Sequence, residues 1–589
     1  MQLTISIKFA IAPTPLKPTQ KPGFYEKYLT PHRNLHRNPV SDTQRDRPFI
    51  PETNQETGFL REMPVSPPNP YIETRFLNPH PIVSLWIEGR TNLPCLSRKA
   101  QHRVMTLNLY NTLTRRQEPF DPVEPPKVRM YCCGVTVYDY CHLGHARSYI
   151  AWDTVRRYLI WRGYEVRYVQ NFTDIDDKII KRAREQNSTM EEVADRYTQT
   201  YFEDMARLNI LEADEYPRAT QTVDGIKQLI QELEQSGYAY ASGGDVYYKV
   251  RKFENYGQLS GRKLEEMKAG ASGRVEDDPE AQKKQDPFDF ALWKEAKPGE
   301  PAWDSPWGSG RPGWHIECSA MVRDRLGDTI DIHMGGADLV FPHHDNEIAQ
   351  SQAVTGKQLA KYWMHNGFVT VNGEKMSKSL GNFTTIRQLL DDGGIAPMVI
   401  RLFVLQAQYR KPIDFTDDAI ASATQGWNTL KEALLFAKQY GEQLGWTSET
   451  SNEPVPELVE RFQDAMDDDF NTSAALAVLF EIAKEIRRDR NLLLHEGKTD
   501  TDPKLLKQQW ETLVTLANVL GLEVDADAEI DEQAAKGLSD AEIEAAIEQR
   551  KAARKAKNFA ESDRIRDELQ AQGISLIDKA GGVTQWHRN

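Results

Sequence analysis

The chain has 589 residues and a mass of 67.3 kDa, which is too long for one hydrophobic core and predicts roughly three to four domains. Its net charge of −14 provides no general basic coat for nucleic acid, and its five cysteines exclude a secreted disulfide framework and favour a reducing, cytoplasmic compartment. No apolar run reaches about 18 residues, so we expect no membrane-spanning segment and no membrane partner.

Residues 1–104 differ from the rest of the chain. They hold 15 of the 32 prolines and carry 14 Lys and Arg against 8 Asp and Glu, without hydrophobic periodicity. Proline-rich stretches such as Pro64–Pro70 cannot sustain a helix or a central strand. We interpret residues 1–104 as a disordered extension, or as upstream sequence that is read from a misplaced start, with Met105 as the true initiator.

A strand–helix–strand unit follows Met105. Lys127–Cys133 predicts a strand that enters a Gly-containing turn, His145–Arg162 predicts an amphipathic helix, and Val166–Val169 predicts a second strand. This order favours a doubly wound parallel sheet of the Rossmann type, so the expected fold class is α/β.

The remaining elements are predicted from their periodicity. Strands are expected at Asp245–Val250 and Ile330–Met334. Helical periodicity continues in three segments: residues 175–235, 344–353 and 416–522. The last of these predicts a helical bundle, and the acidic stretch Asp525–Asp531 then separates a small C-terminal unit.

The first chemical motif is His142-Leu143-Gly144-His145, in the predicted loop between strand and helix. Gly144 lets the backbone pass close to a ligand, and two imidazoles three residues apart at a positive helix N-terminus suit a polyphosphate. Taken alone, the motif is also typical of two surface or core histidines in a turn.

The second motif is Lys375-Met376-Ser377-Lys378-Ser379. Two ammonium groups and two hydroxyls in a flexible loop can close on a pyrophosphate and neutralise charge as it develops. A lysine pair usually marks a solvated loop, but its position downstream of the first motif favours phosphate chemistry.

The third pattern combines Cys133, Cys318, His343 and Glu347. Positions 343 and 347 share one face of a helical turn, and two thiolates, one imidazole and one carboxylate are a reasonable Zn²⁺ ligand set. The two cysteines lack CxxC spacing, however, so the same residues also fit two buried structural cysteines beside a helix-capping cluster.

These motifs carry a family resemblance. HLGH followed by KMSKS resembles the class I aminoacyl-tRNA synthetases, and three segments are very similar to the cysteinyl-tRNA synthetase family: MYCCGVTVYDYCHLGHARS, GWHIECSAM and FPHHDNE. The resemblance covers residues 105–589. It implies a ligase that activates L-cysteine with ATP, releases pyrophosphate, and transfers cysteine to the 3′ end of tRNA(Cys).

The resemblance also implies roles for the motif residues. Contacts to ATP and its phosphates, with Mg²⁺ accompanying ATP, fall on His142, Gly144, His145, Lys375 and Lys378.

One Zn²⁺ per chain is implied at Cys133, Cys318, His343 and Glu347, with the substrate thiol bound directly to the metal. Zinc prefers a thiolate strongly to a serine hydroxyl, so we expect no separate editing domain.

Neighbouring residues compete for the ligand positions. Cys132 and Cys141 lie close to Cys133, but Cys132 points to the other face if the strand continues. The family's cysteine directly precedes the glycine, which favours Cys133. His344 competes with His343, which alone stands four residues before the glutamate.

The amino-acid pocket is assigned less directly. Trp314 and His333 resemble family positions that line this pocket, and His315 is a third candidate. Thr173 and Asp174 follow the second strand, where a nucleotide crevice is expected, but they also fit a helix N-cap with first-turn acids.

The tail carries a basic stripe. Five of the eight residues from 550 to 557 are basic, and Arg550, Arg554 and Lys557 share a helical face that could hold tRNA phosphates. A solvated charged helix is the usual alternative, but the following SDRIRDELQAQGISLID resembles the family's anticodon-binding module.

The domain prediction has seven parts: 1–104, the extension; 105–245, the first half of the catalytic domain; 246–300, an insertion; 301–383, the second half; 384–415, a link; 416–524, a tRNA-binding bundle; and 530–589, the anticodon-binding module. The expected partners of a monomer are tRNA(Cys), L-cysteine and ATP. Two alternatives remain, a tRNA-independent ligase that joins cysteine to an amino sugar, and a non-catalytic synthetase-like RNA-binding protein. An anticodon module at 530–589 would argue against the first.

Overall fold

The computed structural model describes residues 106–266, 282–376, 381–446, 453–525, 538, 540–578 and 584–588. The predicted extension 1–104 and positions 526–531 of the acidic stretch lie outside the described residues. Within the described ranges, no helix is both long and apolar enough to cross a membrane.

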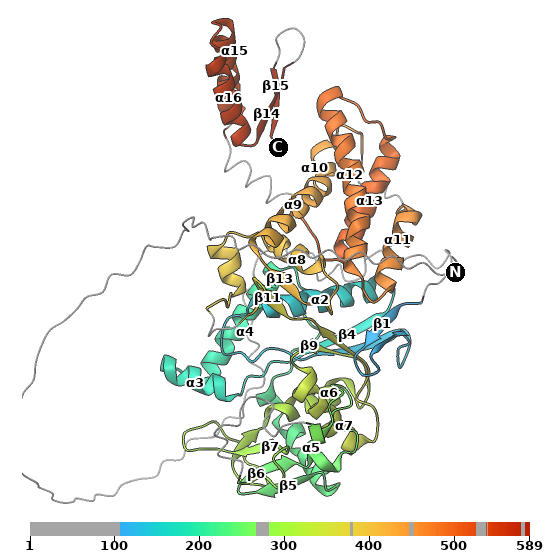
Figure 1. The fold of residues 1–589 in the computed structure, drawn as a ribbon, viewed down its shortest axis with the longest axis vertical. Helices are drawn as coiled ribbons and strands as arrows, with labels where there is room; N and C mark the ends of the chain where they lie inside the picture. Colours follow the sequence, from blue (N-terminus) through green and yellow to red (C-terminus); the bar gives the residue numbers. More distant parts are fainter. Residues whose placement is uncertain are drawn as a thin grey trace, which may run out of the picture. The chain divides into compact units, whose positions relative to one another are not determined.

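Four parallel strands form the central sheet, in the order β10-β9-β3-β4 (Figure 1). The strands are β3 (Lys127–Cys132), β4 (Glu165–Gln170), β9 (Ile330–Gly336) and β10 (Ala360–Asn366). Helix α2, Leu143–Trp161, connects β3 to β4 and confirms the strand–helix–strand prediction and the α/β class. It begins two residues earlier than expected because His142 caps its N-terminus.

The helices predicted around this sheet are present. They are α3 (Asp177–Gln186), α4 (Met190–Arg207), α5 (Val223–Gln235) and α7 (Asp345–Thr355). Helix α6 (Trp314–Leu326) also lies here and was not predicted from the sequence. A π-helical turn, Val340–His344, leads directly into α7. Short 3-10 turns occur at Ala219–Gln221, Val250–Lys252 and Leu264–Glu266.

An antiparallel sheet of four strands lies between the two halves of the central sheet in sequence. Its order is β5 (Ala239–Ser242), β6 (Asp245–Tyr248), β7 (Phe290–Glu295), β8 (Gly310–Pro312). The predicted domain boundaries at 245 and 300 fall inside this one sheet, because β6 pairs with β7 and β7 pairs with β8. Its buried Leu292 and Trp293 share a hydrophobic core with Ile226 of α5.

Small elements surround the second motif. Strands β11 (Val369–Val371), β12 (Glu374–Lys375) and β13 (Ile413–Phe415) form a sheet in the order β12-β11-β13. A π-helical turn at Gln388–Asp392 and helix α8 (Pro397–Leu405) lie between β12 and β13 in sequence. Near the start of the described chain, β1 (Asn108–Asn111) and β2 (Arg116–Pro119) form a hairpin.

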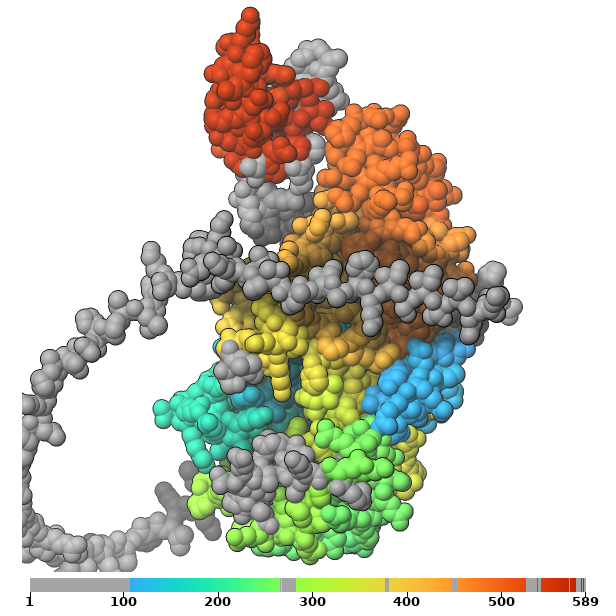
Figure 2. Space-filling model, in the orientation of Figure 1, coloured from blue at the N-terminus to red at the C-terminus, as the bar shows by residue number. Residues whose placement is uncertain are grey.

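The helical pattern of residues 416–522 is confirmed. Its described parts, residues 416–446 and 453–522, hold five helices: α9 (Asp417–Leu434), α10 (Phe436–Tyr440), α11 (Pro456–Asp467), α12 (Thr472–Glu496) and α13 (Pro503–Val519). The C-terminal unit contains α15 (Asp540–Lys555), α16 (Phe559–Ala571), β14 (Ile574–Asp578) and β15 (Thr584–Arg588). It has a hydrophobic core of its own, which includes Ile543, Ile547 and Leu569, and it forms a compact body (Figure 2).

A buried ion cluster connects α2 to α8. Asp153 accepts a hydrogen bond of 2.9 Å from Arg157 Nε and another from Arg401 Nη2. Arg401 also donates to the carbonyls of Leu208 and Leu520, which follow the last turns of α4 and α13. A guanidinium is favourable at these helix C-termini because their free carbonyls carry partial negative charge.

We predict that Arg401→Leu lowers the free energy of unfolding by about 3–5 kcal/mol, because it leaves Asp153 short of a partner in a buried site. Urea denaturation followed by tryptophan fluorescence measures the effect. The control is Arg461→Ala, which removes a half-exposed ion pair with Glu481 and should change stability little. Equal effects of the two variants would contradict the prediction.

Candidate functional site

The three segments predicted to bind metal meet at the carboxyl ends of the central strands. Cys133 follows β3, Cys318 lies in α6, His343 lies in the π-helical turn, and Glu347 lies in the first turn of α7. All four side chains are buried. In doubly wound sheets this edge is where ligands bind.

The distances among these four side chains fit one tetrahedral ion. Cys133 Sγ lies 3.8 Å from Cys318 Sγ, and two sulfurs each 2.3 Å from a tetrahedral Zn²⁺ would be about 3.8 Å apart. Cys133 Sγ lies 3.4 Å from Glu347 Oε1, which lies 3.1 Å from His343 Nε2. The donor atoms all lie within 4.8 Å of one another, and the i, i+4 contact of His343 with Glu347 occurs as predicted.

A second possible group shares two of these residues. His333 and His344 also lie within 4.8 Å of Cys133 and Glu347. His344 Nε2 is 3.3 Å from Cys133 Sγ, whereas His333 Nε2 is 2.9 Å from Glu347 Oε2, the carboxylate oxygen that His343 does not contact. Both His343 and His344 therefore lie close enough to Cys133 and Glu347 to serve as metal ligands, so the structure leaves both alternatives open.

The other candidate cysteines lie elsewhere. Cys132 and Cys141 belong to the hydrophobic cluster around α2, whereas Cys133 and Cys318 belong to the cluster on the opposite side of the strand. This placement agrees with the alternation of side chains along β3.

Burial and neighbouring charges shift the ionisation of the cluster. The hydrogen bond from Cys133 lowers the pKa of the Cys318 thiol, and burial raises the pKa of Cys133. Burial raises the pKa of Glu347, but the adjacent His333 and His343 outweigh it and hold this pKa well below its usual range. The cluster therefore favours one thiolate and one carboxylate, the anionic forms that a metal ion requires.

The predicted pocket residues surround the cluster. The Trp314 ring stacks on the His343 ring with centroids 4.3 Å apart, and His315 Nδ1 lies 3.0 Å from His343 Nδ1. Thr173 donates a hydrogen bond of 3.0 Å to Glu317, which neighbours Cys318 in α6. Asp174 does not cap α3, because Asp176 does so, and Asp174 instead accepts hydrogen bonds from Thr220.

The histidines of the first motif form the N-terminal cap of α2. His142 Nδ1 accepts a hydrogen bond of 3.0 Å from Gly144 N, and His145 Nδ1 accepts one of 3.3 Å from His142 N. The two rings stack with centroids 3.7 Å apart. Burial lowers the pKa of His145 well below its usual value, so this ring is neutral at pH 7.

Met376, which is part of the second motif, and Thr384, which follows that motif, both lie against this cap. A side chain at Gly144 would approach Met376 Cε to 3.5 Å, and Leu143 N donates to Thr384 O at 3.2 Å. Lys375 lies in β12 and is exposed, and Lys378 lies outside the described residues. The structure thus brings the flanks of the second motif to the first, although 230 residues separate His145 from Lys375.

The basic stripe of the tail differs from the prediction. Arg550 is buried, and its two Nη atoms each lie 2.8 Å from an oxygen of Asp578 in β14, so it ties α15 to β14. Arg554 also contacts Asp578 at 2.8 Å but is half-exposed. Helix α15 ends at Lys555, and Lys557 follows with a φ of +58°, so these three residues do not share one helical face.

Two residues of the site were not anticipated from the sequence. His365 Nε2 lies 2.8 Å from His344 Nδ1, and its own Nδ1 lies 2.9 Å from Thr112 Oγ1. Asn171 Oδ1 accepts a hydrogen bond from Gly134 N at 2.8 Å. Asn171 directly follows β4 and His365 is the second-last residue of β10, and a polar residue at the carboxyl end of a parallel strand is the signal that could have identified them.

We predict that Gly134→Ala lowers the free energy of unfolding by at least about 3 kcal/mol, because the new Cβ would lie 1.6 Å from Asn171 O and force β3 away from β4. Thermal or urea unfolding measures this. Gly225→Ala in α5 is the matched control, since its new Cβ would meet nothing closer than 3.8 Å. This substitution should raise the free energy of unfolding by up to about 1 kcal/mol. A stable Gly134→Ala protein would show that this close approach is not required.

Comparisons with known proteins identify the family. The chain matches the family described as tRNA synthetases class I (C) catalytic domain over residues 119–425 and the DALR domain over residues 461–525. It is 68% identical over 491 residues to a cysteine–tRNA ligase of Trichodesmium erythraeum (strain IMS101) and 68% identical over 485 residues to one of Synechococcus elongatus (strain ATCC 33912 / PCC 7942 / FACHB-805). Each match covers 82% of this chain and 100% of the relative.

Among solved structures, the chain is similar to Mycobacterium tuberculosis methionyl-tRNA synthetase in complex with methionyl-adenylate, at 16% identity and a TM-score of 0.45, over 67% of this chain and 90% of that chain. The family assignment rests on the high sequence identity of the curated relatives and on the large share of both chains that these matches cover. The chain belongs to the cysteine–tRNA ligase family of class I tRNA synthetases.

Proposed function

We propose that this chain activates L-cysteine with ATP to form cysteinyl-adenylate and pyrophosphate, and then transfers cysteine to the 3′ end of tRNA(Cys). The observation that carries the proposal is the buried group of Cys133, Cys318, His343 and Glu347, which lies at the ligand-binding edge of a class I catalytic domain. The family explains the ligase reaction, and the cluster explains the choice of amino acid.

The four buried donors suit Zn²⁺. Two sulfurs, one imidazole and one carboxylate match its preferred ligands, and the S–S separation of 3.8 Å fits a tetrahedral site. Bound there, the ion would supply a soft Lewis acid that distinguishes a thiolate from the serine hydroxyl. A purely apolar pocket separates such close analogues by only about one or two orders of magnitude.

The contacts around the donors hold them in place. His333 Nε2 donates a hydrogen bond of 2.9 Å to Glu347 Oε2, and Trp314 stacks on His343, so these two side chains orient ligands as well as lining the amino-acid pocket. Thr173 lies at the same edge and is assigned to substrate binding.

ATP is placed at the N-terminus of α2. His142, Gly144 and His145 would face its phosphates, and the Nδ1 atoms are used in capping, so Nε2 of each ring would make the contact. Lys375 and Lys378 would neutralise charge as pyrophosphate leaves with Mg²⁺. The position of Met376 Cε, 3.5 Å from where a Cβ of residue 144 would lie, supports this pairing of the motifs.

The tRNA is assigned to the helical bundle, residues 416–524, and to the C-terminal module, residues 530–589. Of the three residues of the predicted basic stripe, Arg554 and Lys557 are exposed, while Arg550 acts through its ion pair with Asp578. We propose a monomer that works in the cytoplasm.

The test is a charging assay with each amino acid and purified total tRNA, with zinc measured on the same sample. Cysteine alone should be attached to tRNA, and serine should be rejected. Transfer of cysteine to an amino sugar without tRNA would instead identify the related tRNA-independent ligase.

We predict that Cys318→Ser lowers zinc content and cysteine-dependent pyrophosphate exchange together, by about tenfold or more, because one thiolate ligand is lost. Cys141→Ser is the control, since this buried thiol lies in a different cluster. Near-normal pyrophosphate exchange in a metal-poor Cys318→Ser protein would contradict the assignment of Cys318 as a metal ligand.

We predict that Lys378→Ala lowers the turnover number of cysteinyl-adenylate formation by about 10²–10³-fold while the binding of cysteine changes little, because the charge develops in the transition state. Pyrophosphate exchange and equilibrium binding of cysteine measure the two quantities. An unchanged turnover number would contradict the phosphate role.

A further inference from the structure

Glu317 is a buried carboxylate beside the proposed ligand group, which consists of Cys133, Cys318, His343 and Glu347. It lies in the first turn of α6, directly before Cys318, and only 1% of its surface is exposed. Thr173 Oγ1 donates a hydrogen bond of 3.0 Å to Glu317 Oε2. Thr173 is also buried, so neither side chain has free access to bulk water for its remaining hydrogen bonds.

Thr173 faces the same side of the central sheet as the proposed ligand group. A parallel bridge to the loop after β3 keeps the backbone extended here, so side chains alternate between the two faces. Val169 belongs to the hydrophobic cluster that contains Cys318, whereas Phe172 belongs to the cluster around α2. Asn171 Oδ1 lies 3.8 Å from Cys318 Sγ, and Thr173 is the next residue on that face. The pair of Thr173 and Glu317 therefore lies next to the ligand group.

The Glu317 carboxylate has no cationic partner. Within the part of the chain that the structure describes, it forms no ion pair, and its charged neighbours Asp174 and Asp176 are acidic as well. Those two carboxylates have structural roles, because Asp174 accepts hydrogen bonds from Thr220 and Asp176 caps α3. A buried carboxylate without a cation is unfavourable, so this place is suited to a positive charge that arrives with a ligand.

The hydrogen bond to Glu317 decides what Thr173 can offer to a ligand. A hydroxyl has a single hydrogen, which Thr173 donates to the carboxylate, so its oxygen is left to accept. A ligand that binds Thr173 must therefore donate a hydrogen bond. L-Cysteine carries an ammonium on the carbon next to the one that bears its sulfur, and this ammonium is the strong donor closest to a sulfur held at the ligand group.

We propose that Glu317 is a positioning residue for the amino group of the substrate. It orients the Thr173 hydroxyl so that Oγ1 accepts a hydrogen bond from the α-ammonium of L-cysteine, and its negative charge attracts that ammonium. The proposal rests on the proposed function, because it takes L-cysteine as the substrate. The site would then select a thiol twice, for its sulfur at the ligand group and for its ammonium at the pair of Thr173 and Glu317.

The test compares two thiols that differ only in the ammonium. β-Mercaptopropionate keeps the thiol and the carboxylate of cysteine but has hydrogen in place of the amino group. Titration calorimetry measures the binding of each thiol to zinc-loaded protein, and zinc is measured on every sample. Thr173→Val should weaken the binding of L-cysteine by about tenfold or more and that of β-mercaptopropionate by less than about twofold. Thr173→Ser keeps the hydroxyl and should bind both thiols like the wild type.

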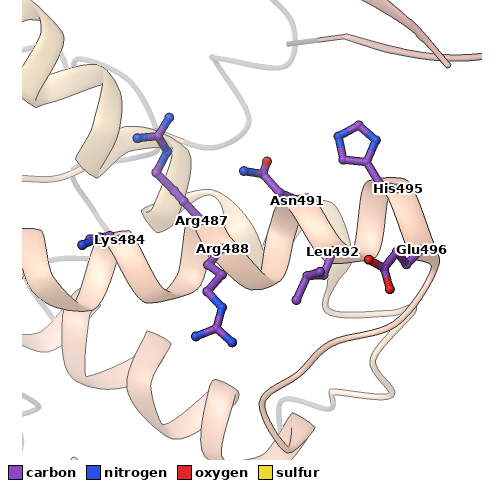
Figure 3. A pocket seen from close by; sticks show the side chains of 7 residues that line it. All are labelled: Lys484, Arg487, Arg488, Asn491, Leu492, His495 and Glu496. Atoms are coloured by element: carbon purple, nitrogen blue, oxygen red, sulfur yellow. The ribbon is translucent and has the colours of Figure 1, made fainter.

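Glu317→Gln removes the charge but keeps the size of the side chain, and it should also weaken the binding of L-cysteine alone by about tenfold or more. Because Glu317 acts through Thr173, the double variant should lose less affinity than the product of the two single losses. The control is Asp489→Asn, which removes another buried carboxylate that accepts from a threonine hydroxyl, that of Thr501, at 2.6 Å. Asp489 lies in the stretch of α12 that Figure 3 shows, in the helical bundle, and its variant should bind both thiols normally.

Equal losses for the two thiols in Thr173→Val, or wild-type affinity for L-cysteine in this variant, would overturn the proposal. Fully multiplicative losses in the double variant would overturn the role of Glu317 as a positioning residue. The Thr173 variants leave α6 unchanged, so they decide the outcome if Glu317→Gln lowers the zinc content. If wild-type protein shows no cysteine-dependent pyrophosphate exchange, the proposed function fails, while a loss of affinity confined to the thiol with an ammonium would still support the proposal.

Discussion

The carboxylate of Asp153, buried midway along α2, is the group on which the joint between the catalytic sheet and the helical region depends. It accepts hydrogen bonds from Arg157, Arg401 and the backbone of Leu211, so one charge connects three segments. Because a buried carboxylate that loses its partners is strongly destabilising, these segments can only be displaced together. Arg401 extends the connection to Leu520, at the end of α13.

The same helix also positions the HLGH motif relative to the KMSKS motif. Its first turn is the His142–His145 cap, and the buried Arg147 directly after it donates to the carbonyls of Val404, Gln408, Tyr409 and Lys411 at 2.8–3.2 Å. That segment leads into β13, which pairs with β11, which in turn pairs with β12 and its Lys375. One guanidinium therefore positions the strands that carry the second motif relative to the helix that carries the first.

The buried group of Cys133, Cys318, His343 and Glu347 shows the cost of placing polar groups in a core. Cys133, Cys318 and Glu347 are all buried, and burial alone disfavours their anionic forms. His333 and His343 outweigh this effect of burial for Glu347, and a divalent cation bound at the cluster would supply further positive charge for the thiolates.

The sequence by itself determined the features that depend on neighbours along the chain. Period-3.6 and period-2 patterns identified α2, β3 and β4, the i, i+4 spacing paired His343 with Glu347, and alternation along β3 separated Cys133 from Cys132. Only the tertiary structure decided which distant groups meet. His365 reaches His344 because β9 and β10 lie in parallel register, the insertion is one sheet because β6 pairs with β7, and Arg550 is buried because Asp578 lies opposite it. Local patterns report only the face on which a residue lies, whereas strand pairing and ion pairing between remote segments depend on how the whole chain packs.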